Sequence, residues 1–267
     1  MNLLPADLVA ALEHAGNPER AVMQARVCNA VPGGYGDGDG FIGVSVPAQR
    51  ALAKKYWRLP LGPLAALLES PIHEHRLTGI LILCERYARD ADDREKTYQF
   101  AFVHRAAANN WDLTDTLGPG VLGLHLARRS RKPLHELAQS ASVWDRRLAM
   151  VSTLPLIREC QYADALTIAH KLFRDKQDIM HKAVGWMLRE IGKKDASALR
   201  NFLQVHSHQM PRTTLRYAIE SFPASDRKQW LSESKAAIKS GTPLPARTPV
   251  LPRSHGALLH RVANTKL

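Results

Sequence analysis

The chain has 267 residues, 45% of them hydrophobic, which is enough to bury a sizeable core in one large domain. Its 37 lysines and arginines outnumber its 25 acidic residues and give a net charge of +12, which favours a polyanionic partner such as nucleic acid. No apolar run approaches the roughly 18 residues that span a bilayer, and the N-terminus does not resemble a signal peptide, so we expect no membrane partner and no secretion.

Helical periodicity recurs along the chain, interrupted by short Pro, Gly, Asp or Asn signals, and strand signals are nearly absent. The expected helices lie at 3–15, 47–57, 63–69, 73–89, 94–109, 111–117, 119–129, 133–140, 143–154, 160–173, 177–193, 195–206, 210–221 and 225–239.

From residue 73 onward these helices group into pairs, which start near residues 73, 111, 142, 177 and 210. Helix pairs of this length are typical of HEAT-type solenoids, in which each pair buries its apolar face against its neighbours and the stack curves. We therefore predict an all-α, HEAT-like solenoid of stacked antiparallel helix pairs with a concave basic groove, formed by residues 1–240.

Two segments fall outside this array. Residues 31–43 form a glycine-rich loop ahead of the helix that Pro47 opens. Residues 241–267 contain prolines and basic residues but no acidic residue, so we expect a flexible basic tail there.

The glycine-rich loop contains two motifs that do not hold on inspection. Gly38-x-Gly40-x-x-Gly43 matches the dinucleotide-binding pattern, but no strand precedes it and no crossover helix follows. Asp37 and Asp39 resemble the start of a calcium loop, but the acidic residue required at its twelfth position is missing. We expect neither a nucleotide nor a calcium ion in this loop.

Two His-x-His pairs, His73/His75 and His206/His208, occur without supporting carboxylates or cysteines beside them. We interpret both pairs as solvated helix ends rather than metal sites.

The three cysteines, Cys28, Cys84 and Cys160, are far apart in the sequence and lie in apolar or mixed surroundings. This usage is typical of reduced thiols in a cytoplasmic protein. We expect no disulfide framework and no thiolate metal site.

The helix expected at 177–193 has a tryptophan on the side opposite its apolar face. The apolar side consists of Val184, Met187, Leu188 and Ile191, and the opposite side of Lys182, Trp186, Arg189 and Lys193. A tryptophan flanked by cations is suited to lie against a sugar–phosphate backbone, with the cations on phosphates. The alternative is a tryptophan buried against a neighbouring repeat, with Arg189 stacked on it.

The helix expected at 111–117 repeats this arrangement. Leu113 and Leu117 mark its inward face, and Trp111 and Asp115 share the other side. A carboxylate aimed into a phosphate-binding surface opposes binding, and catalysis is one reason to place it there, because it can stabilise a cationic sugar-like transition state or hold a water molecule. The alternative is a salt bridge to a neighbouring arginine.

The helix expected at 143–154 places an arginine within its apolar stripe. Trp144, Leu148 and Val151 form the stripe, and we expect Trp144 in the core. Arg147 projects among them and needs an anionic partner, for which a phosphate or the carboxylate of Asp115 would serve.

The segments NNWDLTD, VWDRRLAMV and HKAVGWMLREIGKK, in this order on a helical-repeat chain, resemble the AlkD-type bacterial DNA alkylation repair glycosylases. The segment YGDGDGFIGVSVPAQRALAKKY resembles the N-terminal part of the same family. The resemblance implies hydrolysis of the N-glycosidic bond of N3- and N7-alkylated purines in duplex DNA, without a metal or cofactor and without drawing the base into a pocket. It also implies a bacterial cytoplasmic protein at the nucleoid, and we expect a monomer.

Carried over by motif, the resemblance makes Asp115 the catalytic carboxylate and makes Trp111, Trp186 and Arg147 the walls of the cleft at the damaged nucleotide. Arg189 and Lys193, with Lys182 beside them, would bind phosphates. Pro47 and the segment before it, which includes Tyr35, would contact the strand near the lesion.

Two other readings remain open at this point. A non-catalytic solenoid that binds branched or distorted DNA or RNA would keep the basic groove and would not need Asp115. A protein-binding HEAT scaffold would bind DNA with little salt dependence and would assign no role to Trp186.

Overall fold

The computed structural model describes residues 5–240, and the predicted tail at 241–267 lies outside the described residues. The helices are α1 (Ala6–His14), α2 (Pro18–Val27), α3 (Val46–Lys55), α4 (Leu61–Leu68), α5 (His73–Arg89), α6 (Arg94–Val103), α7 (Trp111–Leu117), α8 (Gly123–Leu126), α9 (Lys132–Leu137), α10 (Val143–Val151), α11 (Leu154–Arg158), α12 (Ala163–Leu172), α13 (Asp178–Lys194), α14 (Ala196–His206), α15 (Arg212–Ala218) and α16 (Ala224–Ser240).

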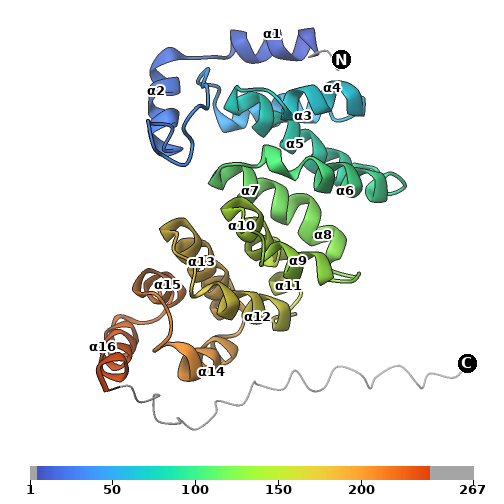
Figure 1. Cartoon of the computed structure of the whole chain (residues 1–267). Coiled ribbons are helices and arrows are strands. Elements are labelled where there is room, and N and C mark those ends of the chain that lie inside the picture. The colour runs from blue at the N-terminus through green and yellow to red at the C-terminus, as the bar shows by residue number, and fades with distance from the viewer. Residues whose placement is uncertain (1–4, 241–267) are drawn as a thin grey trace, which may run out of the picture.

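The helices stack in chain order, from α1 at one end to α16 at the other (Figure 1). Along one side of the stack, α5, α7, α10, α13 and α15 contact one another in succession and form what we call the inner row. The helix pairs from α5 onward start at residues 73, 111, 143, 178 and 212, close to the predicted starts. The predicted all-α solenoid is confirmed.

The core follows the predicted apolar faces. On α13, Val184, Met187 and Leu188 are fully buried, whereas Lys182 is exposed and Trp186 is half-buried. Among the described helices none combines the length and the apolar character needed to cross a membrane.

The sequence analysis did not predict helices α2 and α11. None of the residues of α2 is buried, and its apolar residues Val22, Met23 and Val27 are exposed, so they do not mark a face that packs on the core. Its start is nevertheless marked, because Asn17 caps it by accepting a hydrogen bond from the backbone N–H of Arg20 at 2.8 Å and Pro18 follows as the first helical residue. The helix α11 is a short continuation that begins where the predicted helix 143–154 ends.

The helix predicted at 119–129 is divided in two. A π-helical turn at 118–122 links α7 to α8, and both flanking glycines lie against α10 and the chain after it. A Cβ on Gly118 would meet Val151 Cγ2 at 2.7 Å, and one on Gly123 would meet the carbonyl oxygen of Ser152 at 2.2 Å. Because neither glycine has a side chain, the second helix pair can pack closely against the third.

The glycine-rich loop before α3 is fixed on the start of α5. The buried Glu74 carboxylate accepts hydrogen bonds from the backbone N–H groups of Ile42, Gly43 and Val44 at 2.7–3.3 Å. Gly43 has a φ of +77°, and a Cβ there would lie 1.9 Å from the carbonyl oxygen of Asn17, so only glycine fits.

The prediction that His73 and His75 form a solvated helix end is wrong. Both side chains are buried, with 2% and 5% of their surface exposed, because the loop at 39–43 folds over the start of α5. His73 stacks on Phe41 with ring centroids 4.7 Å apart.

Candidate functional site

The structure brings six of the sequence-predicted residues to one hollow on the inner row. The hollow has a volume of about 400 Å³ and lies where α7, α10, α13 and α15 meet the loop before α3. Its lining consists of Tyr35, Trp111, Arg147, Ile179, Lys182, Trp186, Arg189 and Tyr217. Four aromatic side chains and three cations therefore share one concave surface, which we call the aromatic hollow.

Trp111 opens α7, and the buried residue before it fixes its place. The side-chain oxygen of Asn110 accepts a hydrogen bond from the backbone N–H of Trp111 at 2.8 Å, and its amide nitrogen donates to the carbonyl oxygen of Cys28 at 3.0 Å. The hydroxyl of Thr114 donates to the carbonyl oxygen of Trp111 at 2.9 Å. The first turn of α7 is thereby tied to the chain after α2.

Asp115 and Arg147 form a two-pronged ion pair across α7 and α10. Arg147 Nε donates to Asp115 Oδ1 at 3.0 Å and Arg147 Nη2 to Asp115 Oδ2 at 2.8 Å. The third nitrogen, Nη1, donates to the carbonyl oxygen of Ile179 at 2.6 Å. Such a pair holds the plane of the carboxylate in a fixed orientation.

The two side chains of this pair differ in exposure, 6% for Arg147 and 17% for Asp115. Burial raises the pKa of the Asp115 carboxyl above its ordinary value, although the Arg147 guanidinium acts in the opposite direction. The Asp115 side chain is thus the more exposed member of the pair.

The cations of α13 that reach the hollow are both paired with acids. Lys182 Nζ lies 2.9 Å from Asp178 Oδ2, one helical turn earlier. Arg189 pairs with Glu220, two residues after the end of α15. A phosphate that binds here competes with these carboxylates.

Three of the predicted site residues do not line the hollow. Pro47 is exposed in the first turn of α3. Lys193 points to Glu190, with Nζ 2.8 Å from Oε1. Asp115 is not itself a lining residue, but its carboxylate holds the guanidinium of Arg147, which is.

Two lining residues, Ile179 and Tyr217, were not predicted. Tyr217 belongs to α15, whose place opposite α13 depends on Gly185. A Cβ on Gly185 would lie 2.4 Å from Tyr217 Cβ and 2.7 Å from the carbonyl oxygen of Thr214. This glycine beside Trp186 was the available signal, since it marks a close approach by another helix.

The prediction that Trp144 lies in the core is wrong. Trp144 is half-buried and meets Tyr35 edge to face, with ring centroids 5.6 Å apart. The loop before α3 reaches over α10 and supplies this partner, which no periodicity within α10 could reveal.

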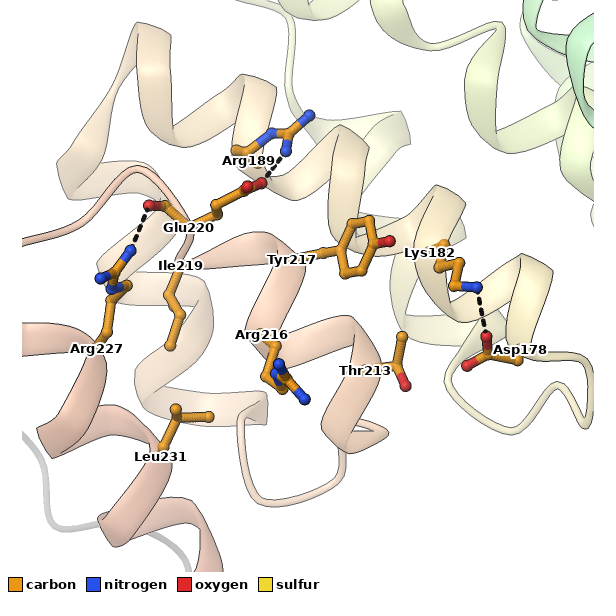
Figure 2. Close-up of a pocket in the computed structure, with 10 residues that line it drawn as sticks. All are labelled: Asp178, Lys182, Arg189, Thr213, Arg216, Tyr217, Ile219, Glu220, Arg227 and Leu231. Carbon is orange, nitrogen blue, oxygen red and sulfur yellow. Dashed lines mark hydrogen bonds and ion pairs between the residues drawn. The ribbon is translucent and has the colours of Figure 1, made fainter. Parts of the chain in front are cut away.

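A second hollow, of about 640 Å³, adjoins the first and shares Lys182, Arg189 and Tyr217 with it. Figure 2 shows its lining, in which Glu220 lies between Arg189 and Arg227 and Asp178 pairs with Lys182. The lining residues are Asp178, Lys182, Arg189, Thr213, Arg216, Tyr217, Ile219, Glu220, Arg227 and Leu231. Four cations against two acids make this surface suited to anions.

The aromatic hollow is suited to a partner that combines flat or apolar rings with negative charge. Within the described part of the chain, its lining contains no acid, histidine or cysteine, so the lining itself offers no ligand set for a metal ion. A nucleotide has the matching chemistry, since sugars and bases contact aromatic faces and phosphates contact Lys and Arg.

Comparison with known proteins agrees with this chemistry. A family model described as "DNA alkylation repair enzyme" matches residues 8–222. Among solved structures, the chain is similar to a predicted DNA alkylation repair enzyme from Enterococcus faecalis, with a TM-score of 0.58 and 16% sequence identity over 78% of this chain and 97% of that chain. No curated protein matches the sequence.

Proposed function

This chain belongs to the DNA alkylation repair enzyme family, and on that premise we propose that it is a glycosylase that hydrolyses the N-glycosidic bond of positively charged N3- and N7-alkylated purines in duplex DNA. The observation that carries the proposal is the aromatic hollow, where Trp111, Trp186 and Arg147 meet beside the carboxylate of Asp115. We propose further that the protein acts as a monomer in the bacterial cytoplasm, on nucleoid DNA.

The proposed reaction requires one carboxylate and no general acid from the protein. Alkylation at N3 or N7 puts a positive charge on the purine, so the base leaves without being protonated and no paired general acid is required. Asp115 stabilises the oxocarbenium-like sugar and positions the attacking water. Arg147 holds the carboxylate in the orientation that this role requires, through the two hydrogen bonds at 3.0 and 2.8 Å.

The walls of the hollow bind the rest of the nucleotide. Trp111, Trp186 and Tyr35 pack against the sugar–phosphate backbone at the lesion, while Lys182 and Arg189 bind the phosphates. The second hollow continues this surface with Arg216 and Arg227, where the flanking backbone lies. Because the hollows are open and the aromatic walls contact the backbone, the base need not be flipped into a pocket.

The test is release of the base from duplex DNA that carries a single N7-methylguanine, measured at equal DNA occupancy. We expect Asp115→Asn to bind but to release the base more slowly by on the order of 100-fold or more, because the developing cation loses its counter-charge. Asp164→Asn on α12 is the matched control, since Asp164 is also an ion-paired aspartate, 2.8 Å from His135, and does not line the hollow. It should release the base at the wild-type rate.

One observation favours a second candidate, a non-catalytic solenoid that binds distorted DNA. Both oxygens of Asp115 are occupied by Arg147, as in an ordinary structural ion pair. If the wild-type protein binds the modified duplex but does not accelerate base release, the glycosylase proposal is wrong and this second function replaces it.

A further inference from the structure

Three residues from distant parts of the sequence meet beneath the loop before α3. Cys28 follows α2, His73 opens α5 and Asp112 is the second residue of α7. One ligand atom from each side chain lies within 4.8 Å of the others. Cys28 and His73 are 4% and 2% exposed, and the Asp112 side chain is 21% exposed, so the cluster is largely shielded from water.

Asp39 fixes the orientation of the His73 imidazole, at the ring nitrogen that faces away from Asp112. Its Nδ1 lies 3.1 Å from Asp39 Oδ2, and that same oxygen accepts a hydrogen bond from Arg76 Nη2 at 2.7 Å. Its Nε2 faces Asp112 Oδ2 at 2.8 Å, on the side of Cys28. A carboxylate that holds one imidazole nitrogen while the other points at further ligands is the usual outer arrangement of a metal-binding histidine.

The charge around Cys28 favours a cation. Asp39, Glu74 and Asp112 lie near this thiol, together with the guanidinium of Arg76 and the imidazole of His73. Within residues 5–240 the Cys28 sulfur makes no hydrogen bond, so it is available as a ligand.

We propose that Cys28, His73 and Asp112 bind a divalent transition-metal ion, for which zinc fits the sulfur, nitrogen and oxygen donors best. These three ligands leave a fourth position to water. The site lies outside the aromatic hollow and takes no part in the proposed hydrolysis, so this inference does not rest on the glycosylase proposal. The proposal reverses the expectation of no thiolate metal site, because the ligands are 39 or more residues apart in the chain and only the fold brings them together.

The ion would join two walls of the aromatic hollow. Cys28 lies at the base of the loop that carries Tyr35, and Asp112 directly follows Trp111. A bound metal would therefore add a direct link between the loop and α7 to the hydrogen bond that Asn110 donates to Cys28.

The test is addition of CoCl₂ to the full-length protein after treatment with a chelator. We expect a thiolate-to-cobalt charge-transfer band in the near ultraviolet that saturates at one equivalent and that ZnCl₂ abolishes. Cys28→Ser should lose the band, and Asp39→Asn, which removes the support of His73, should weaken cobalt affinity by about 10- to 100-fold. Cys160→Ser is the matched control and should keep the band, because Cys160 is exposed and outside the cluster.

If Cys28→Ser fails to fold, Asp112→Asn is the second variant, because Asp112 is the most exposed of the three ligands. Asp112→Asn should lower cobalt affinity at least as much as Asp39→Asn. The absence of the band in the wild-type protein, or a band that survives in Cys28→Ser or is lost in Cys160→Ser, would overturn the proposal. The cluster would then be a metal-free network in which His73 bridges Asp39 and Asp112.

Discussion

At the scale of single residues, the ion pair between Asp115 and Arg147 determines how the proposed reaction depends on pH. The carboxylate acts in its ionised form, so base release falls as the pH drops through the pKa of Asp115. Burial raises that pKa and Arg147 lowers it. Removing Arg147 therefore raises the pKa further.

We predict that Arg147→Met shifts the acid limb of the pH–rate profile to higher pH, in addition to lowering the maximal rate. The measurement is release of N7-methylguanine across the acid range. Arg146→Met is the control, because Arg146 lies on the same helix but pairs with Asp175 at 2.6 Å. An unshifted limb in Arg147→Met would show that Asp115 does not govern the rate.

A second residue-scale prediction concerns the acids that occupy the proposed phosphate sites. Glu220→Gln removes the Glu220 partner of Arg189 and one negative charge from the second hollow, so DNA should bind more tightly by about two- to five-fold. Fluorescence anisotropy with an undamaged duplex measures this. Glu136→Gln makes the same charge change on α9, where Glu136 pairs with Lys132, and should leave the affinity nearly unchanged. Equal gains in both variants would point to net charge rather than to Arg189.

The residues of the candidate site were predictable only where a side chain departed from the apolar pattern of its own helix. Trp111 and Trp186 stood out because each faces away from its own helix's apolar residues. Tyr217 did not stand out, since its contribution depends on how α15 packs against α13 at Gly185, which is a property of two helices. Arg147 was predicted to need an anionic partner, with Asp115 as one candidate, and the structure pairs the two.

At the scale of helices, the sequence pattern gave accurate bounds for some helices and missed others. The predicted ranges 73–89 and 111–117 match α5 and α7 residue for residue. By contrast α2 was not predicted, and it buries no residue because its apolar side chains Val22, Met23 and Val27 are exposed. The stacking of pairs followed from their length, whereas the fold of the glycine-rich loop depends on Glu74, a residue of another element.

The packing of α13 on α15 gives a prediction at this scale. Gly185→Ala introduces a Cβ within 2.4 Å of Tyr217 Cβ, so the helices must move apart and stability should fall by about 1–3 kcal/mol. Urea unfolding measures the loss. Gly192→Ala on the same helix is the control, because its Cβ meets the end of the flexible Leu199 side chain and should cost less. Alanine has a higher helix propensity than glycine, so propensity alone would stabilise both variants. Equal losses would therefore mean that the contact with Tyr217 costs no more than the contact with Leu199.

At the scale of the whole molecule, the net charge of +12 predicts strongly salt-dependent DNA binding. The logarithm of the association constant should fall linearly with the logarithm of salt concentration, and Lys182→Ala should reduce the slope by about 0.9, the value for one phosphate contact. Lys132→Ala, on α9 and outside both hollows, should leave the slope unchanged. Binding that is insensitive to salt would instead favour a protein-binding scaffold.

The absence of buried side chains in α2 has a consequence for how the fold opens. Among the described residues, hydrogen bonds join α2 to the loop. Arg20 donates to the carbonyl oxygen of Gly43 at 2.9 Å, and Gln24 donates to that of Val44 at 3.0 Å. Its amide hydrogens should therefore exchange with deuterium through local fraying, long before those of α13, whose apolar face is fully enclosed. We expect α2 in this sense to open locally and to yield to a bound duplex while the central helices stay closed.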